Sequence, residues 1–188
     1  MGEREMKLKK EIMLSTGEEL LLRSLTPQDA QEAIRVCTKA AGETLNLSRY
    51  ADEWRITLDE EQVYIYRMEN GSKSLMIGAF MRGRMVGIAS FAPPAPTDRA
   101  RHRANLGITI LKSHWGMGVG TAMMRAMIDA AKTTALEQLE LDVVSTNEKA
   151  IRLYERCGFE EYGRHPRMMK YRDGTYADMI LMMLDLRK

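Results

Sequence analysis

The chain has 188 residues, which is enough for one well-packed domain and short for two. Its apolar fraction of 45%, charged fraction of 29% and net charge of +2 are those of an ordinary globular protein, and they give no sign of a nucleic-acid or anionic-membrane partner. No apolar run reaches the length of a membrane span, and the charged first residues do not resemble a signal peptide.

The first half of the chain predicts two hairpins separated by two helices. Polar residues and glycine at 15–18, and the pair Arg82–Gly83, mark the turns of the hairpins. Thr26 suits the cap of the first helix, and Pro27 suits its first position. We expect the four elements, in order, at residues 9–25, 26–40, 58–70 and 73–92.

The second half predicts strands that alternate with helices before a final hairpin. A polar loop over 92–105 precedes a strand, a glycine-rich stretch and a helix, and a second strand and helix follow. Ser145 and Glu148 have the spacing of a capping box at the start of the last helix. We expect these elements at residues 106–111, 121–135, 139–145 and 145–159, and the hairpin at 162–186.

This mixed order predicts an α/β fold with a largely antiparallel sheet. No internal repeat or low-complexity linker divides the chain. We therefore expect a single domain over 1–188, with an N-terminal strand or hairpin extension at 1–17 and a core at 18–188.

The stretch HWGMGVGTAMM, residues 114–124, places Gly116, Gly118 and Gly120 directly before a helix. Glycine in regular structure costs roughly 0.5–1 kcal/mol relative to alanine, so three glycines so close together indicate a tight turn or the close approach of a ligand. The first N–H groups of a helix lack partners within it, and they attract anions. A phosphate-bearing ligand is therefore the first hypothesis.

Two nucleotide-binding loops fit this stretch poorly. A triphosphate loop requires a lysine after its last glycine, whereas Thr121 and Ala122 stand here. A dinucleotide loop requires G-x-G-x-x-G with a downstream acid; the spacing here is one residue shorter, although Asp142 ends the next strand. Because the preceding hairpins leave too little chain for a doubly wound sheet, a dinucleotide-dependent oxidoreductase is kept only as an alternative.

Two separate motifs indicate coenzyme A instead. WGMGVGTAMM resembles the pyrophosphate loop of the GNAT superfamily of N-acetyltransferases, and NEKAIRLYERCGF, residues 147–159, resembles the run N-x-x-A-x-x-x-Y-x-x-x-G-F that follows it there. The resemblance extends over nearly the whole chain, and it is closest to the bacterial branch of ribosomal-protein N-terminal and small-amine acetyltransferases. It implies one GNAT-like domain with a mixed, mostly antiparallel sheet of six to seven strands, about four flanking helices and a V-shaped splay between the two central strands.

The resemblance also implies acetyl-CoA as co-substrate, no metal, and direct attack on the thioester by a primary amine in a ternary complex. The strand before the loop would pair with the pantetheine arm like an added strand, and amides of the loop would bind the pyrophosphate. The residues concerned are Ile108, Thr109 and Ile110 in the strand and Met117, Gly118, Val119, Gly120 and Thr121 in the loop and helix start.

Asn147, Ala150 and Tyr154 share one face of the helix that follows. By resemblance, Asn147 bonds an amide of the arm and Ala150 leaves space for it. Tyr154 would be the general acid that protonates the departing thiolate, since a phenol with a pKa near 10 keeps its proton at neutral pH. The alternative is a half-buried core tyrosine whose hydroxyl bonds a backbone group.

Two positions depart from the pattern of the family. Trp115 stands where glutamine or arginine is usual, so backbone N–H groups would carry most of the pyrophosphate binding. Asn105 stands where relatives often have a glutamate, so the general base is left open. The candidates are His102, Glu140, Asp142 and a water that relays the proton.

The acceptor is left as a small-molecule or peptide amine, bound by residues 45–70 and 167–176. A non-catalytic module that binds acetyl-CoA is the alternative from another class. We expect no nucleic-acid or membrane partner, and a homodimer by analogy with the family.

Two further groups of residues receive modest roles. Cys37 and Cys157 match no metal or disulfide pattern, which predicts a reducing, cytoplasmic location, and Cys157 is expected to be a small packing residue. Arg99, Arg101 and Arg103 are expected in a solvated loop, with attraction of an acidic acceptor as the alternative.

Overall fold

The computed structural model describes residues 7–95 and 97–187. Within them the chain forms one sheet of eight strands, which are β1 Lys9–Met13, β2 Glu19–Ser24, β3 Leu75–Met81, β4 Arg84–Ala92, β5 Arg103–Ile110, β6 Gln138–Val144, β7 Glu160–Lys170 and β8 Tyr176–Asp185. Four α-helices accompany it, which are α1 Ala30–Glu43, α2 Leu58–Glu69, α3 Val119–Lys132 and α4 Glu148–Arg156. Short 3-10 turns lie at Pro27–Asp29, Ala51–Glu53 and Lys112–His114.

The strands follow the order β1-β2-β3-β4-β5-β6-β8-β7 across the sheet. Every neighbouring pair is antiparallel except β5 and β6, which are parallel. The β3–β4 hairpin turns at Arg82 and Gly83, whose φ angles of 51° and 75° are those of a two-residue hairpin turn. The first five strands therefore form a continuous meander once α1 and α2 are set aside.

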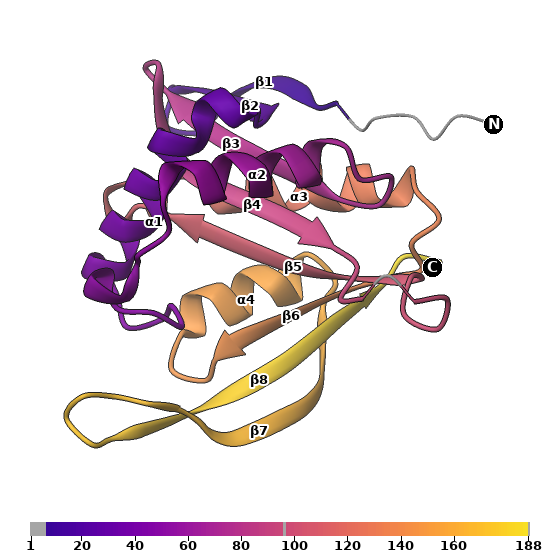
Figure 1. Ribbon diagram of the computed structural model, residues 1–188. Helices are drawn as coiled ribbons and strands as arrows, with labels where there is room; N and C mark the ends of the chain where they lie inside the picture. Colours follow the sequence, from indigo (N-terminus) through magenta and orange to yellow (C-terminus); the bar gives the residue numbers. More distant parts are fainter. Residues whose placement is uncertain (1–6, 96, 188) are drawn as a thin grey trace.

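The sheet opens at its centre. β5 and β6 pair only from Arg103 with Gln138 to Asn105 with Glu140. Beyond that point β5 stays paired with β4, and β6 stays paired with β8. The two central strands consequently diverge in a V, and Figure 1 shows α4 between them.

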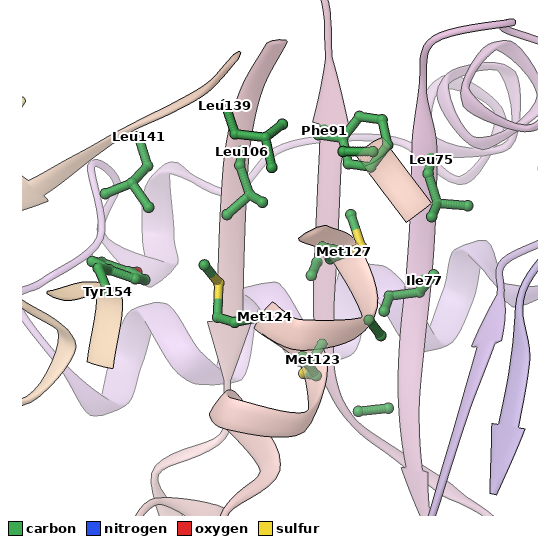
Figure 2. Close-up of a cluster of buried hydrophobic side chains, with 14 of the residues drawn as sticks. Leu75, Ile77, Phe91, Leu106, Met123, Met124, Met127, Leu139, Leu141 and Tyr154 are labelled. Carbon is green, nitrogen blue, oxygen red and sulfur yellow. The ribbon is translucent and has the colours of Figure 1, made fainter. Parts of the chain in front are cut away.

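The two faces of the sheet are covered by different helices. On one face α1 and α2 pack on β3 and β4 around Ile65, Met85 and Ile88. On the other face α3 and α4 cover the larger cluster, in which Met123, Met124 and Met127 of α3 and Tyr154 of α4 meet the strands (Figure 2). Methionine thus fills the core between α3 and the sheet.

The structure confirms the predicted fold class, the four helices and the splay between the central strands. The sheet has eight strands where six to seven are predicted, because both strands of the first hairpin join it and β1 forms one edge. Leu14, in the turn of this hairpin, is 7% exposed and belongs to the main core cluster. Residues 1–6 of the predicted extension lie outside the described residues.

Thr26 and Pro27 stand at the cap and the first position of a helical turn, as predicted, whereas the start of α4 differs from the prediction. The carboxylate of Asp29 accepts hydrogen bonds from the N–H and Oγ1 of Thr26, so a 3-10 turn forms first and α1 begins at Ala30. The predicted cap at Ser145 is wrong, because the N–H of Ser145 donates to Asp178 O and extends the pairing of β6 with β8. Asn147 caps α4 instead, and its side chain accepts from Ala150 N at 3.4 Å.

The strand β5 begins three residues earlier than predicted. Arg103 is a strand residue and not a loop residue, and its guanidinium forms an ion pair with Glu140 of β6 at 2.6 Å. This pair lies where the two strands are still hydrogen-bonded. The ion pair therefore stabilises the closed end of the V, where β5 and β6 are still paired.

Candidate active site

A cavity of about 720 Å³ occupies the splay between β5 and β6. Its walls come from the end of α1 and the loop after it, from both diverging strands, from the glycine stretch and from α4. Nine of the eleven predicted binding residues line it, which are Ile108, Thr109, Ile110, Gly118, Gly120, Thr121, Asn147, Ala150 and Tyr154. The two motifs that are far apart in the sequence thus meet at one site.

The strand β5 offers a free backbone edge to this cavity. Leu111 N donates to Val86 O of β4. Since N–H and C=O groups alternate in direction along a strand, those of Ile108 and Ile110 point away from β4, into the splay. Those of Thr109 point toward its partner Ile88 on β4, so Thr109 reaches the cavity with its side chain only.

The glycine stretch turns twice before α3 begins. Gly116 and Gly118 have φ angles of +78° and +92°, which strain any residue with a Cβ. The first intrahelical bond of α3 runs from Ala122 N to Gly118 O, at 3.0 Å. The N–H groups of the residues between, Val119, Gly120 and Thr121, therefore project from the helix end as donors for an anion.

Met117 and Val119 are the two predicted residues that do not line the cavity. The side chain of Val119 is 1% exposed within the main core cluster, and Met117 packs against that cluster. Their side chains hold the loop on the core, while their backbone amides remain part of the glycine stretch. Gly120 serves close packing, since a Cβ there would lie 3.0 Å from Leu153 Cδ2 of α4.

Trp115 has a role that the sequence does not reveal. Its indole Nε1 donates a hydrogen bond to the carbonyl oxygen of Ile110, 2.8 Å away. The indole thereby ties the glycine stretch to the end of β5, on the edge that faces the splay. Tryptophan at this position braces the loop instead of supplying a charge.

Helix α4 brings Tyr154 to the cavity from the side of the sheet that α3 also covers (Figure 2). The side chain of Tyr154 is 7% exposed, and its ring meets that of Phe159 at a centroid distance of 6.2 Å. Burial, with a smaller contribution from Cys157, raises the pKa of Tyr154 to about 12. The phenol therefore holds its proton throughout the physiological range and can act as a donor.

Only one of the three candidate bases reaches the cavity. His102 precedes β5 at the closed end of the V and is not among the lining residues. Glu140 is held in its ion pair with Arg103 and in a bond from Gln138 Nε2 at 2.5 Å. Asp142 lines the cavity with part of its side chain in solvent, and desolvation of the remainder, together with the charge of Glu140, raises its pKa.

The sequence predicts only some of the residues that line the end of the cavity beside α1. Asn46, Leu47 and Ser48 belong to the expected acceptor segment, whereas Ala40 of α1, Thr44 just after α1 and Met179 of β8 are additions. Side chains from distant segments converge here, so no local pattern could have identified them.

The loop after α1 is tied to the tip of the β7–β8 hairpin. Nη2 of Arg172 donates to both carboxylate oxygens of Asp52, at 2.8 and 2.7 Å. The backbone N–H of Arg172 donates to Tyr50 Oη at 3.0 Å. The guanidinium also lies 4.0 Å from the centroid of the Tyr50 ring. Because Ser48 lines the cavity, this contact forms a strap on the α1 side of the site.

The two cysteines do not have the lowered pKa of a reactive thiol. Both cysteines are free, and burial raises the pKa of each thiol, that of Cys37 to about 12. Among residues 7–95 and 97–187, no group of three or more histidine, cysteine, aspartate or glutamate side chains could hold a metal. No helix in this described part of the chain is both long and apolar enough to cross a membrane.

Comparisons with known proteins agree with this geometry. The Acetyltransferase (GNAT) family matches residues 41–159 of the chain. An L-methionine sulfoximine/L-methionine sulfone acetyltransferase from Pseudomonas aeruginosa is 23% identical over 141 residues, which cover 75% of this chain and 81% of that protein. The Bacillus subtilis protein YdaF, which its name assigns provisionally to ribosomal N-acetylation, is 31% identical over 173 residues, or 86% of each chain.

A solved structure has the same fold. The Salmonella typhimurium protein yncA, solved with its cofactor acetyl-CoA, superposes with a TM-score of 0.79 at 20% identity, over 90% of this chain and 95% of that one.

Proposed function

Because the chain belongs to the GNAT family of acetyltransferases, in which acetyl-CoA is the acetyl donor, we propose that it acetylates a primary amine by direct attack in a ternary complex. Residues 1–188 would form one N-acetyltransferase domain. The observation that carries the proposal is the cavity in the V, which joins a free strand edge, a helix start rich in free amides and a buried tyrosine.

The cofactor would lie along the open edge of β5. The N–H and C=O of Ile108 and the N–H of Ile110 would pair with the pantetheine amides, as an added strand would. The amides of the segment from Met117 to Thr121 would hold the pyrophosphate, helped by the helix dipole. Support comes from the positive φ angles of Gly116 and Gly118, which let the chain turn tightly just before the start of α3.

Helix α4 would hold the arm and supply the acid. Ala150 leaves room beside the cavity, and Asn147 lines it while it caps α4 with its side chain. Acetyl-CoA supplies an activated acetyl group when bound. Tyr154 would donate its proton to the sulfur as the carbon–sulfur bond breaks, and an outward N–H of β5 would face the carbonyl oxygen.

The pKa of Tyr154 determines when its proton can pass to the sulfur. A thiol has a pKa near 8.5, below the value of about 12 for Tyr154. Because a thiolate is a weaker base than this phenolate, the proton would pass to sulfur only in step with cleavage, while Tyr154 takes up the proton that the attacking nitrogen releases. Tyr154 would be a proton donor at every pH at which the amine is reactive.

We also propose a cytoplasmic location and a homodimer. The two free cysteines suit a reducing cytoplasm. The exposed edge strand β7 offers a surface for the homodimer that the family resemblance implies, and light scattering tests that assembly state.

A thiol-release assay over a panel of amines tests the function. Amine-dependent release of the CoA thiol, together with an N-acetylated product of matching amount, is the expected result. Persistent silence despite saturable acetyl-CoA binding would instead favour a non-catalytic acetyl-CoA-binding module. The protein alone serves as the blank for Cys37 and Cys157.

A further inference from the structure

Charge is unevenly distributed around the cavity. Helix α4 contributes the cationic lining side chains, Lys149, Arg152 and Arg156. On the α1 side the lining residues are small, apolar or uncharged, apart from the carboxylate of Asp142. The cations suit an anionic cofactor, and the carboxylate suits a cationic acceptor on the α1 side.

The direction of the Asp142 side chain follows from its neighbours. Leu141 and Val143 belong to the core cluster that α3 and α4 cover, and Figure 2 shows Leu141 beside Tyr154 in that cluster. Because side chains alternate along a strand, Asp142 points to the opposite face, the face that α1 covers. Asp142 and Tyr154 therefore approach the splay from opposite sides.

The position of Asp142 along β6 places it at the open part of the V. β6 leaves β5 after Glu140, so Asp142 is the first residue beyond the junction that points to the α1 side. Across the gap stands Gly107 of β5, where a Cβ would meet no atom within 4 Å. An amine bound between Gly107 and Asp142 would lie next to the strand edge assigned to the thioester.

The arginines on this side already have partners. Arg103 is paired with Glu140, and Arg172 with Asp52. Arg49, next to the lining residue Ser48, lies over the Trp54 ring at 5.4 Å. A carboxylate carried by the acceptor would therefore compete for these cations while it lies beside the negative charge of Asp142.

We propose that the acceptor is an amine whose adjacent carbon carries no free carboxylate, and that Asp142 binds its ammonium group and accepts its proton. The proposal rests on the proposed N-acetyltransferase function. It separates this chain from enzymes that acetylate free amino acids, which the Pseudomonas aeruginosa relative is named for.

The proton balance is closed by groups in the cavity. The ammonium form of the acceptor loses one proton to Asp142, and the free amine forms the nitrogen–carbon bond as the carbon–sulfur bond breaks. A second proton leaves the nitrogen and restores Tyr154, which has protonated the sulfur. Overall one proton reaches bulk water through Asp142, and the products are the amide and the CoA thiol.

Three titratable or charged groups face Asp142. Partial burial, with a smaller contribution from Glu140 on the same strand, raises the pKa of Asp142, which brings this carboxylate closer to the range in which a base is effective. Tyr162 of β7 interacts with both carboxylates, and Arg103 of β5 offsets Glu140 through their ion pair. The free carboxylate form is needed, so activity is expected to rise with pH through the pKa of Asp142.

Matched acceptors test the substrate class. The wild-type chain is assayed with L-methionine sulfone and with its primary carboxamide, at equal concentrations of the protonated amine that Asp142 would bind, with spermidine and a short peptide as further arms. We expect kcat/KM for the carboxamide to exceed that for the acid by at least about tenfold, from like-charge repulsion at the cavity. Equal or better use of the acid would overturn the proposal while leaving N-acetyltransfer intact. If no acceptor is acetylated although acetyl-CoA binds, N-acetyltransfer itself fails.

The isosteric variant Asp142→Asn tests the residue. We expect kcat/KM for the carboxamide to fall about 10²-fold, the rise of activity with pH to disappear, and the preference over the acid to shrink. Asp129→Asn, an exposed aspartate on α3 paired with Lys10, is the matched control. Retention of both the pH profile and the preference by Asp142→Asn would overturn the role of Asp142, and thermal unfolding separates these effects from a loss of folding.

Discussion

The indole Nε1 of Trp115 donates a hydrogen bond to the carbonyl oxygen of Ile110, 2.8 Å away. This contact joins the loop that would hold the pyrophosphate to the strand that would hold the pantetheine arm. Trp115→Phe keeps an aromatic ring and removes the N–H donor. We expect the KM for acetyl-CoA to rise about fivefold, as the loss of one hydrogen bond of about 1 kcal/mol implies, with kcat little changed.

The second tryptophan of the chain provides the control. Trp54 directly follows the 3-10 turn at Ala51–Glu53 and does not line the cavity. Trp54→Phe should leave the KM for acetyl-CoA unchanged. An equal effect of both substitutions would contradict the bracing role of Trp115.

Tyr154→Phe tests the proton donor. We expect kcat to fall about 10²-fold, with the Kd for acetyl-CoA unchanged, because the ring remains in its cluster while the proton is lost. The pKa of Tyr154 is raised to about 12, so its proton is fully present below that value and is lost only above it. Wild-type activity should therefore show no alkaline decline from this group up to about pH 10.5. Exposed Tyr66→Phe on α2 is the control, and an alkaline decline with an apparent pKa near 10 that disappears in Tyr154→Phe would exclude the buried-phenol account.

Gly118→Ala tests whether Gly118 serves acetyl-CoA binding in addition to relieving backbone strain. Both Gly118 and Gly83 have positive φ, +92° and +75°, and neither leaves a Cβ in a clash, so an added methyl group costs about 1–2 kcal/mol of backbone strain at either position. Gly83 lies in the β3–β4 turn, away from the cavity. We expect similar losses of unfolding free energy in the two variants, and weaker acetyl-CoA binding in Gly118→Ala alone. If calorimetry finds the same acetyl-CoA affinity in both, the glycine is structural only.

Much of the fold could be predicted from local patterns, because hairpin turns, helix caps and the glycine stretch are encoded within a few residues of one another. The α4 motif likewise predicts a cavity residue, Tyr154. The roles of Trp115 and Arg103 could not be predicted in this way. Both depend on partners in other elements, Ile110 and Glu140, whose positions follow from sheet register and from the point at which β5 and β6 part.

The general base could not be chosen from the sequence for the same reason, because its position depends on how the strands pair. In the sequence Glu140 and Asp142 look alike, as alternate acids on one strand. The parallel pairing of β5 and β6 ends at Glu140. Glu140 therefore forms an ion pair with Arg103, whereas Asp142 lies beyond the paired segment and faces the cavity. Register decides their chemistry, and a single sequence contains little information about register.

The strap between Arg172 and Asp52 gives a prediction for the acceptor side. Arg172→Gln removes the charge while the chain length stays similar. We expect the KM for the amine to rise about threefold, because the exposed pair orders the loop only modestly, and the KM for acetyl-CoA to stay the same. Arg187→Gln, which removes an exposed arginine paired with Asp185 near the end of β8, is the control. A change in the KM for acetyl-CoA instead would show that the strap does not act on the acceptor side.

The central claim is that one cavity holds acetyl-CoA and the amine at the same time, on either side of the splay. Initial rates measured while both substrates are varied test it most directly. Direct transfer predicts intersecting lines in double-reciprocal plots and no acetylated enzyme by intact mass when acetyl-CoA is supplied alone. Parallel lines, together with an acetyl group on the chain that an amine then removes, would contradict it.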